Sequence, residues 1–155
     1  MKSLLQQLAD ICRRKSWPLA VAESCTGGML GDMITSLPGS SGFFLGGVIA
    51  YSDQVKLNLL KIPEGLLKKN GAVSPEVALS MSRGIKELLG ASIGVAITGI
   101  AGPGGGSQKK PVGLVFISVI TPESEIVERF NFSGNRREIK TSATKAAIEL
   151  LFNIV

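Results

Sequence analysis

Residues 93–120, IGVAITGIAGPGGGSQKKPVGLVFISVI, carry the clearest signal of the fold of this chain. Its two ends, Ile93–Ile97 and Val112–Ile120, are apolar runs without alternation. Such runs are typical of strands that are covered on both faces of a sheet. The glycine-rich segment between them indicates a loop that directly follows a strand. The stretch therefore predicts a central sheet with helices packed on both of its sides.

Shorter signals on either side complete the order of elements. Helix starts are marked by capping residues or by a proline in the first turn. The expected strands lie at 17–22, 43–51, 93–97, 112–120 and 125–132, and the expected helices begin near Ser3, Met29, Asp53, Pro63, Pro75 and Asn135. The order α-β-α-β-α-α-β-β-β-α predicts one three-layer α/β/α sandwich with a mixed central sheet, a single domain over residues 1–155.

The chain has no histidine among its 155 residues, and this limits the possible chemistry. Ser-His-Asp and Cys-His hydrolases are excluded, and so is a metal site with histidine ligands. Nucleophilic catalysis would need a serine or a cysteine that lysine or tyrosine activates. Such chemistry needs no metal ion and no organic cofactor, and none is expected.

Charge and cysteine content limit the partners and the compartment. The formal net charge is +5, but the longest basic run is Arg13-Arg14-Lys15 and the chain has one Trp and one Tyr. Nucleic-acid binding usually needs a basic stripe interleaved with stacking aromatics. Cys12 and Cys25 are too few for a disulfide framework, and no secretory segment or apolar run of membrane-spanning length is found. We expect a soluble cytoplasmic protein that binds neither nucleic acid nor membrane.

A first candidate site is the junction Glu23-Ser-Cys-Thr-Gly-Gly28, where a strand runs into a helix. Helix starts offer free N–H groups to anions, and the paired glycines allow a ligand close to the backbone. The hydroxyls of Ser24 and Thr26 add donors. The alternative is structural: Thr26 caps the helix and Cys25 is a small buried filler.

A second candidate site is the loop Thr98-Gly-Ile-Ala-Gly-Pro-Gly-Gly-Gly-Ser107. Ligands of α/β sheets usually bind where strands end, although a merely flexible connector is the alternative. Arg136, at the start of the last helix, opposes the helix dipole unless an anion lies nearby. It is therefore a candidate clamp for a phosphate or carboxylate, with a solvated surface arginine as the alternative.

A third candidate site combines Ser41, Tyr51 and Lys56. Their spacing matches neither the Ser-x-x-Lys motif nor a dehydrogenase pair, so any pairing must form through space. Lysine has a reference pKa of about 10.4, and it can accept a proton from serine at neutral pH only if burial or positive charge lowers that value. Spacing alone equally allows a turn serine, a core-edge tyrosine and a surface lysine.

Six ordered motifs resemble the CinA C-terminal domain family, which includes stand-alone nicotinamide-mononucleotide amidases. They are Ala22-Glu-Ser-Cys-Thr-Gly-Gly28, Pro38-Gly-Ser-Ser41, Gly46-Gly-Val-Ile-Ala-Tyr-Ser52 with Lys56, Gly71-Ala-Val-Ser74, Thr98-Gly-Ile-Ala-Gly-Pro103 and Lys110-Pro-Val-Gly113. The resemblance runs from about Trp17 through Lys145. It implies hydrolysis of the carboxamide of nicotinamide mononucleotide to nicotinate mononucleotide and ammonia, and it implies a homodimer.

The resemblance also implies residue roles. Ser41 is expected as the nucleophile, Lys56 as the general base and Tyr51 as an activating hydroxyl. Apart from the resemblance, acyl transfer needs donors for the oxyanion, and we expect backbone N–H groups near Gly42–Gly47 to supply them. The expected substrate-binding residues are Glu23, Ser24, Thr26, Gly27, Gly28, Gly46, Thr98, Gly99, Gly102 and Arg136.

Two differences from the family pattern are visible. Asp53 stands where asparagine is more familiar, next to the motif that carries Lys56. The N-terminal domain of larger members, which resembles molybdopterin-biosynthesis proteins, has no counterpart here, and a free-standing amidase is expected.

Three other hypotheses stay open at this point. One is a nucleotide-binding module of the same fold without turnover. Another is a competence-associated interaction domain that serves DNA uptake or recombination. The third keeps the amidase reaction but makes the Cys25 thiol the nucleophile.

Overall fold

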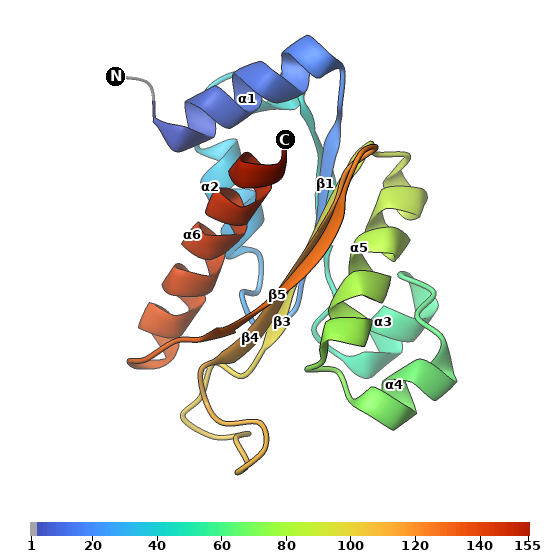
Figure 1. Cartoon of the computed structure of the whole chain (residues 1–155), viewed down its shortest axis with the longest axis vertical. Helices are drawn as coiled ribbons and strands as arrows, with labels where there is room; N and C mark the ends of the chain where they lie inside the picture. The colour runs from blue at the N-terminus through green and yellow to red at the C-terminus, as the bar shows by residue number, and fades with distance from the viewer. Residues whose placement is uncertain (1–2) are drawn as a thin grey trace.

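The computed structural model describes residues 3–155, within which five strands form one sheet in the order β2-β1-β3-β4-β5 (Figure 1). The bounds are Leu19–Glu23 for β1, Phe44–Ile49 for β2, Ile93–Gly99 for β3, Leu114–Ile120 for β4 and Glu125–Asn131 for β5. β1 pairs in parallel with both β2 and β3, whereas β4 pairs antiparallel with β3 and with β5. The sheet is therefore mixed, as the sequence predicts.

Helices cover both faces of this sheet (Figure 1). On one side lie α1 (Leu4–Lys15), α2 (Met29–Thr35) and α6 (Arg136–Ile154). On the other side lie α3 (Asp53–Asn58), α4 (Glu64–Asn70) and α5 (Pro75–Leu89). Every residue of β1 and β4 is buried, which explains why their sequences show no alternation. The predicted three-layer α/β/α architecture is confirmed.

Two large hydrophobic clusters fill the spaces between the layers. The larger one joins the sheet to α1, α2 and α6, and Leu8, Leu30 and Ile97 belong to it. The second joins the sheet to α5 and to the α3–α4 region, and it includes Leu60 and Met81. Successive side chains of a strand point to opposite faces, so the sheet contributes to both clusters.

The element boundaries differ from the prediction at the first strand. The sequence predicts this strand from Trp17, but β1 begins at Leu19. The Trp17 amide donates to the Cys12 carbonyl in the cap of α1, and Pro18 has no amide hydrogen to give to a neighbouring strand. The predicted strand 43–51 is also shorter, and a 3-10 turn at Ser40–Gly42 precedes it.

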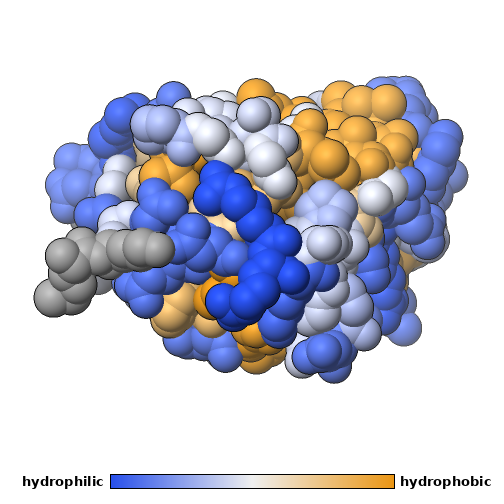
Figure 2. Space-filling model, turned by 90° about the horizontal axis from the view of Figure 1, so that it is seen from above, coloured by the Kyte–Doolittle hydropathy of each residue, from blue (hydrophilic) through white to orange (hydrophobic). Residues whose placement is uncertain are grey.

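The surface is mostly polar around α1, and an apolar area lies on the side away from the N-terminus (Figure 2). Exposed large hydrophobic side chains include Leu45 and Ile49 on the edge strand β2 and Leu88 on α5. None of the helices within residues 3–155 is long and apolar enough to span a bilayer.

Candidate functional site

The pocket of interest lies at one end of the sheet, beyond the carboxyl ends of the parallel strands β1, β2 and β3. Ser24 directly follows β1, Lys56 lies in α3 after β2, and Thr98 is near the end of β3. β5 runs toward the same end, and Arg136 begins α6 soon after it. A pocket of about 290 Å³ opens here. Ligands of α/β sheets characteristically bind at the carboxyl ends of strands.

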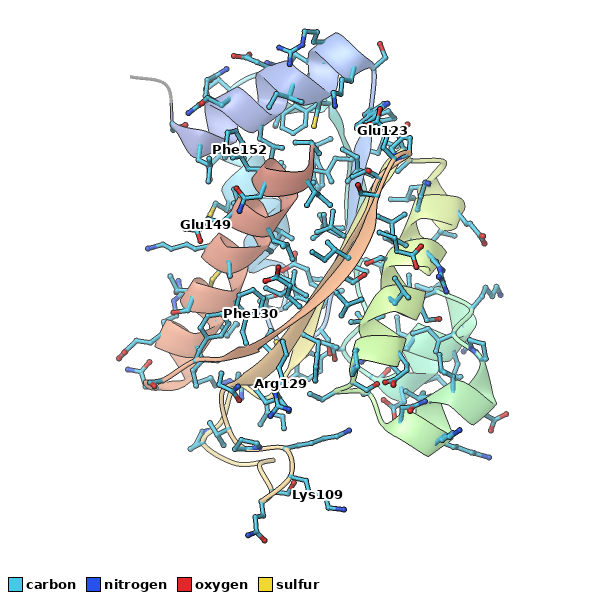
Figure 3. All side chains as sticks on the ribbon, viewed as in Figure 1. Lys109, Glu123, Arg129, Phe130, Glu149 and Phe152 are labelled. Atoms are coloured by element: carbon cyan, nitrogen blue, oxygen red, sulfur yellow. The ribbon has the colours of Figure 1, made fainter. Side chains whose placement is uncertain are left out.

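The pocket brings together part of the predicted set of site residues. The lining residues that the sequence predicts are Ser24, Tyr51, Lys56, Thr98, Gly99, Gly102 and Arg136. The loop between β3 and β4 forms much of the remaining wall and extends beyond the sheet, with Lys109 near its far end (Figure 3). Ala72 and Val73, which precede α5, also line the pocket. They belong to one of the six motifs of the resemblance, but their apolar side chains gave no reason to predict them as site residues.

Lys56 is the central side chain of this pocket. It is only 1% exposed, and its Nζ lies 3.1 Å from Ser24 Oγ. The same Nζ donates to the carbonyl oxygens of Ala50, at 2.7 Å, and Tyr51, at 3.3 Å. A neutral amine has two hydrogens and one lone pair. The two carbonyls can take the hydrogens, and the Ser24 hydroxyl can donate to the lone pair.

Burial lowers the pKa of Lys56 from its ordinary value of 10.5, while the charge of Asp53 acts in the opposite direction. Removing the ammonium from water disfavours its charged form, which is the physical reason for the shift. Lys56 is therefore suited to accept a proton, and the hydroxyl within its reach belongs to Ser24.

The predicted pairing of Ser41 with Lys56 is wrong. Ser41 is exposed in the turn before β2, whereas Lys56 follows β2, so the two lie at opposite ends of a six-residue strand. A strand of that length spans roughly 20 Å. The oxyanion donors expected at Gly42–Gly47 are displaced from the pocket for the same reason.

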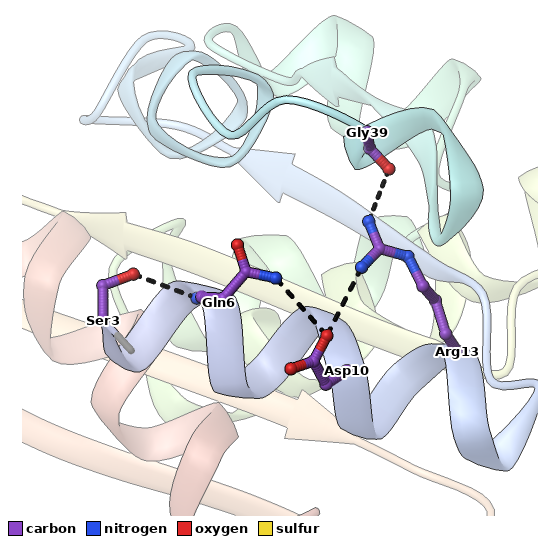
Figure 4. Close-up of polar contacts among 5 residues, drawn as sticks. All are labelled: Ser3, Gln6, Asp10, Arg13 and Gly39. Carbon is purple, nitrogen blue, oxygen red and sulfur yellow. Dashed lines mark hydrogen bonds and ion pairs between the residues drawn. The ribbon is translucent and has the colours of Figure 1, made fainter. Parts of the chain in front are cut away.

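Arg13 on α1 holds the turn that carries Ser41. Its guanidinium donates to the Gly39 carbonyl at 2.6 Å and forms an ion pair with Asp10 at 3.6 Å (Figure 4). It also lies over the ring of Phe43, 5.4 Å from the ring centroid. This turn is therefore bound to α1, at the end of the sheet away from the pocket.

Tyr51 and Arg136 form one wall of the pocket. Arg136 donates to the Tyr51 hydroxyl at 3.1 Å and to the Gly102 carbonyl at 2.7 Å. The Tyr51 side chain is therefore at the predicted site, but its hydroxyl is bonded to Arg136 and not to Ser24 or Lys56. A guanidinium has five N–H donors, so Arg136 can bind an anion while it keeps both contacts.

Several predicted substrate-binding residues have other positions. Glu23 and Thr26 are buried and hydrogen-bonded to each other at 2.6 Å, so both are engaged within the protein. Gly27 and Gly28 line a separate hollow that faces Arg137 and Lys140. Gly46 lies within β2, where it pairs with Ala20. None of these five residues lines the pocket that holds Lys56.

Thr98 reaches the pocket, but its hydroxyl is already used. The side chain is 1% exposed and donates to the Ala72 carbonyl at 2.8 Å. This bond ties the end of β3 to the segment before α5. Thr98 therefore shapes the wall of the pocket.

Cys25 lines the same pocket beside Ser24. Burial raises the pKa of its thiol to about 11. The reactive form of cysteine is the thiolate, and a thiol with this pKa is almost fully protonated at neutral pH. This environment disfavours Cys25 as the nucleophile.

Other parts of the described chain offer less chemistry. A larger groove of about 420 Å³ lies between α1, α2 and α6, but it is mainly apolar and its ionisable residues, Lys145 and Glu149, are exposed. Within residues 3–155, no group of three or more His, Cys, Asp or Glu side chains is arranged to hold a metal ion.

The fold and the pocket define an α/β protein with a buried lysine–serine pair at the carboxyl edge of its sheet. A family model described as the CinA C-terminal domain matches residues 1–155. The chain belongs to this family.

Curated relatives of this chain are longer proteins. A putative competence-damage inducible protein from Moorella thermoacetica is 50% identical over 134 residues, which cover 86% of this chain and 32% of the relative. A CinA-like protein from Desulfotalea psychrophila is 47% identical over 138 residues, which cover 89% of this chain and 33% of the relative. The chain thus spans about a third of the length of these relatives.

Solved structures of similar size share the fold. The competence damage-inducible protein A from Klebsiella pneumoniae has a TM-score of 0.93 at 32% identity, covering 97% of this chain and 94% of that one. A CinA superfamily protein from Escherichia coli has a TM-score of 0.94 at 28% identity, covering 98% of this chain and 88% of that one.

Proposed function

We propose that this domain hydrolyses the carboxamide of nicotinamide mononucleotide, with Ser24 as the nucleophile and Lys56 as the general base. The observation that carries the proposal is the contact of 3.1 Å between Lys56 Nζ and Ser24 Oγ at the floor of a polar pocket. This geometry supports acyl transfer as the reaction class. The choice of nicotinamide mononucleotide rests on the resemblance to the amidases of the family.

In the first step, neutral Lys56 accepts the hydroxyl proton while Ser24 Oγ attacks the amide carbon. Lys56, now an ammonium, donates this proton to the departing ammonia. Water then attacks the acyl-enzyme ester while Lys56 accepts one of its protons. Lys56 returns this proton to Ser24 Oγ as the ester bond breaks, which releases nicotinate mononucleotide and restores the serine hydroxyl and the neutral amine. The contacts of Lys56 with the Ala50 and Tyr51 carbonyls hold its Nζ in place throughout. Lys56 Nζ therefore serves as either the base or the acid in every proton transfer.

The developing oxyanion needs a donor close to Ser24. The Cys25 amide directly follows Ser24 and belongs to the turn that carries the nucleophile. An amide directly after a nucleophile at a strand–turn–helix junction is well placed for this role. One such donor contributes about 3–4 kcal/mol to transition-state stabilisation. We assign the role to the Cys25 N–H in place of the glycines before β2.

Arg136 is the group in this pocket that suits the substrate phosphate. It is exposed, its charge is fixed, and its bonds to Gly102 and Tyr51 aim the guanidinium along the pocket wall. A planar guanidinium can bind two phosphate oxygens at once. Recognition at Arg136 would leave the carboxamide end of the substrate free to reach Ser24.

Two serine variants test the proposal. Ser24→Ala should abolish ammonia release from nicotinamide mononucleotide, and Ser41→Ala should retain the wild-type rate, because only Ser24 lies near Lys56. Ammonia is measured with a coupled assay, and calorimetric titration with the same nucleotide checks binding. Undiminished turnover by Ser24→Ala would remove the serine mechanism. Tight binding with no ammonia from the wild-type protein would favour the non-catalytic nucleotide-binding module.

A further inference from the structure

Glu23 carries a buried carboxyl group that the reaction described above does not use. It is 1% exposed and ends β1, immediately before Ser24. Its Oε1 accepts hydrogen bonds from the Thr26 hydroxyl at 2.6 Å and the Leu30 amide at 2.9 Å. Its Oε2 accepts from the Gly31 amide at 3.0 Å. All three donors belong to the segment that follows Ser24.

These bonds replace a missing helix cap. The residue at the N-cap of α2 is Gly28, which has no side chain to accept from the free amides of the first turn. Helix starts leave such amides unsatisfied unless a side chain binds them. Glu23 does so from five residues earlier, and it thereby closes the turn of residues 24–28 between the strand and the helix.

The main chain of Glu23 is linked to Lys56 as well. Its carbonyl accepts from the Ala50 amide at 2.7 Å, and the Ala50 carbonyl in turn accepts from Lys56 Nζ at 2.7 Å. The Ser24 amide, one residue later, donates to Ile97 on β3. The side chain of Glu23 therefore holds the turn that carries Ser24. Its carbonyl group is connected to Lys56 through two successive hydrogen bonds, by way of Ala50.

From this arrangement we infer that Glu23 is a positioning residue that keeps Ser24 Oγ within hydrogen-bonding distance of Lys56 Nζ. Glu23 does not line the pocket, so it would act through Ser24 and not on the substrate itself. The inference rests on the proposed function, because it assigns Glu23 a part in the same reaction. Small misplacements of a reacting group cost large factors in rate, so the effect should appear in kcat.

Glu23→Gln is the test variant, and Thr121→Val is the matched control. Glutamine keeps the shape of the side chain but replaces one acceptor oxygen with an NH2 group, so it cannot accept all three bonds. Thr121 is also buried and holds a turn, through bonds from the Glu123 and Ser124 amides. That turn joins β4 to β5 at the other end of the sheet, where Glu123 is labelled (Figure 3).

Activity is measured well below the melting temperature of every variant. Glu23→Gln should lower kcat by about tenfold or more, with an unchanged KM and an unchanged midpoint in the pH profile, because Arg136 and the backbone contacts of Lys56 stay in place. Thr121→Val should melt at a lower temperature and keep its kcat. A crystal structure of Glu23→Gln should place Ser24 Oγ more than about 3.5 Å from Lys56 Nζ, beyond a hydrogen bond.

Two results would overturn the inference. One is a kcat for Glu23→Gln within about twofold of the wild type, a factor worth less than 0.5 kcal/mol. The other is a retained contact between Ser24 and Lys56 in the variant's crystal structure. If the wild-type protein releases no ammonia, the proposed function fails, and the crystal structure still decides whether Glu23 positions Ser24.

Discussion

At the scale of single residues, the state of Lys56 decides what the pocket can do. A lysine in water is almost fully protonated at neutral pH and cannot take a proton from serine. Here burial lowers the lysine pKa, and Asp53 works against that effect. Asp53 also lines the pocket and is exposed, so it can be changed without disturbing the core. The balance between burial and this carboxylate should set the pH range of activity.

Asp53→Asn tests this balance. The base works in its neutral form, so kcat/KM should rise with pH through the pKa of Lys56. Removing a negative charge that raises this pKa should move the midpoint to lower pH. The profile is measured at low ionic strength, because salt screens charges at such distances. Glu128→Gln, a neutralisation on the exposed strand β5, is the control and should leave the midpoint in place. A midpoint that moves to higher pH would contradict the assignment.

The sequence identified most of the polar side chains of the pocket but paired Lys56 with the wrong serine. Lys56, Tyr51, Thr98 and Arg136 all lie where the resemblance places them, around one pocket. The prediction was wrong for Ser41, although the predicted order of strands already places Ser41 and Lys56 at opposite ends of one strand. A residue before a strand and a residue after it cannot meet, whereas Ser24 and Lys56 both follow parallel strands. The burial that lowers the lysine pKa is a three-dimensional property that no local pattern carries.

At the scale of elements, α5 is the helix that holds the second face of the sheet together. It packs on β1, β3 and β4, and its glycine at position 84 lets the chain after α3 come close. A Cβ at Gly84 would meet the backbone carbonyl of Leu60, which cannot move as a side chain can. The close approach of α5 to this segment thus depends on the absence of one methyl group.

Gly84→Ala should lower the free energy of unfolding by about 1–3 kcal/mol, because overpacking forces the helix away from the Leu60 segment. Gly65→Ala is the matched control, since it changes a helical glycine with nothing within 4 Å of the added methyl group. That change should be neutral or stabilise by up to ~1 kcal/mol through helix propensity. Urea denaturation measures both. Equal effects of the two substitutions would show that packing at Leu60 is not the cause.

The helices were predictable where their ends carry specific residues. Ser3, Ser74 and Asn135 accept from the amides that their capping patterns predict, at Gln6, Val77 and Glu138. The predicted start of α2 at Met29 is confirmed as well, but its cap comes from Glu23, which lies outside the usual capping position. A contact from the end of one element to the start of the next leaves no fixed spacing in the sequence.

At the scale of the whole molecule, the two hydrophobic clusters share one sheet. Val21 of β1 belongs to the cluster under α1, α2 and α6, while Ala20 and Ala22 belong to the cluster under α5. Neither cluster can lose its strands without exposing the other.

The homodimer that the resemblance implies stays a prediction. The uncharged edge strand β2, with Leu45 and Ile49 exposed, contrasts with the charged edge strand β5.

The shared sheet predicts a single unfolding transition. Trp17 is the only tryptophan of the chain, and it packs at the cluster under α1 with Lys15 Nζ 4.3 Å from its ring centroid. Its fluorescence reports one side of the sheet, whereas far-UV circular dichroism also reports α3, α4 and α5. The urea midpoints of the two signals should coincide, as in two-state unfolding. A lower midpoint for the Trp17 signal would mean that the two layers unfold separately.

The position of Arg136 at the start of the last helix has a consequence for the protein during its synthesis. Residues 24–56 leave the ribosome before Arg136, which emerges only with α6. A nascent chain can therefore hold the serine and the lysine before it holds the arginine that faces them across the pocket. We expect a chain that is still attached to the ribosome to remain inert toward nucleotides until α6 has emerged and docked.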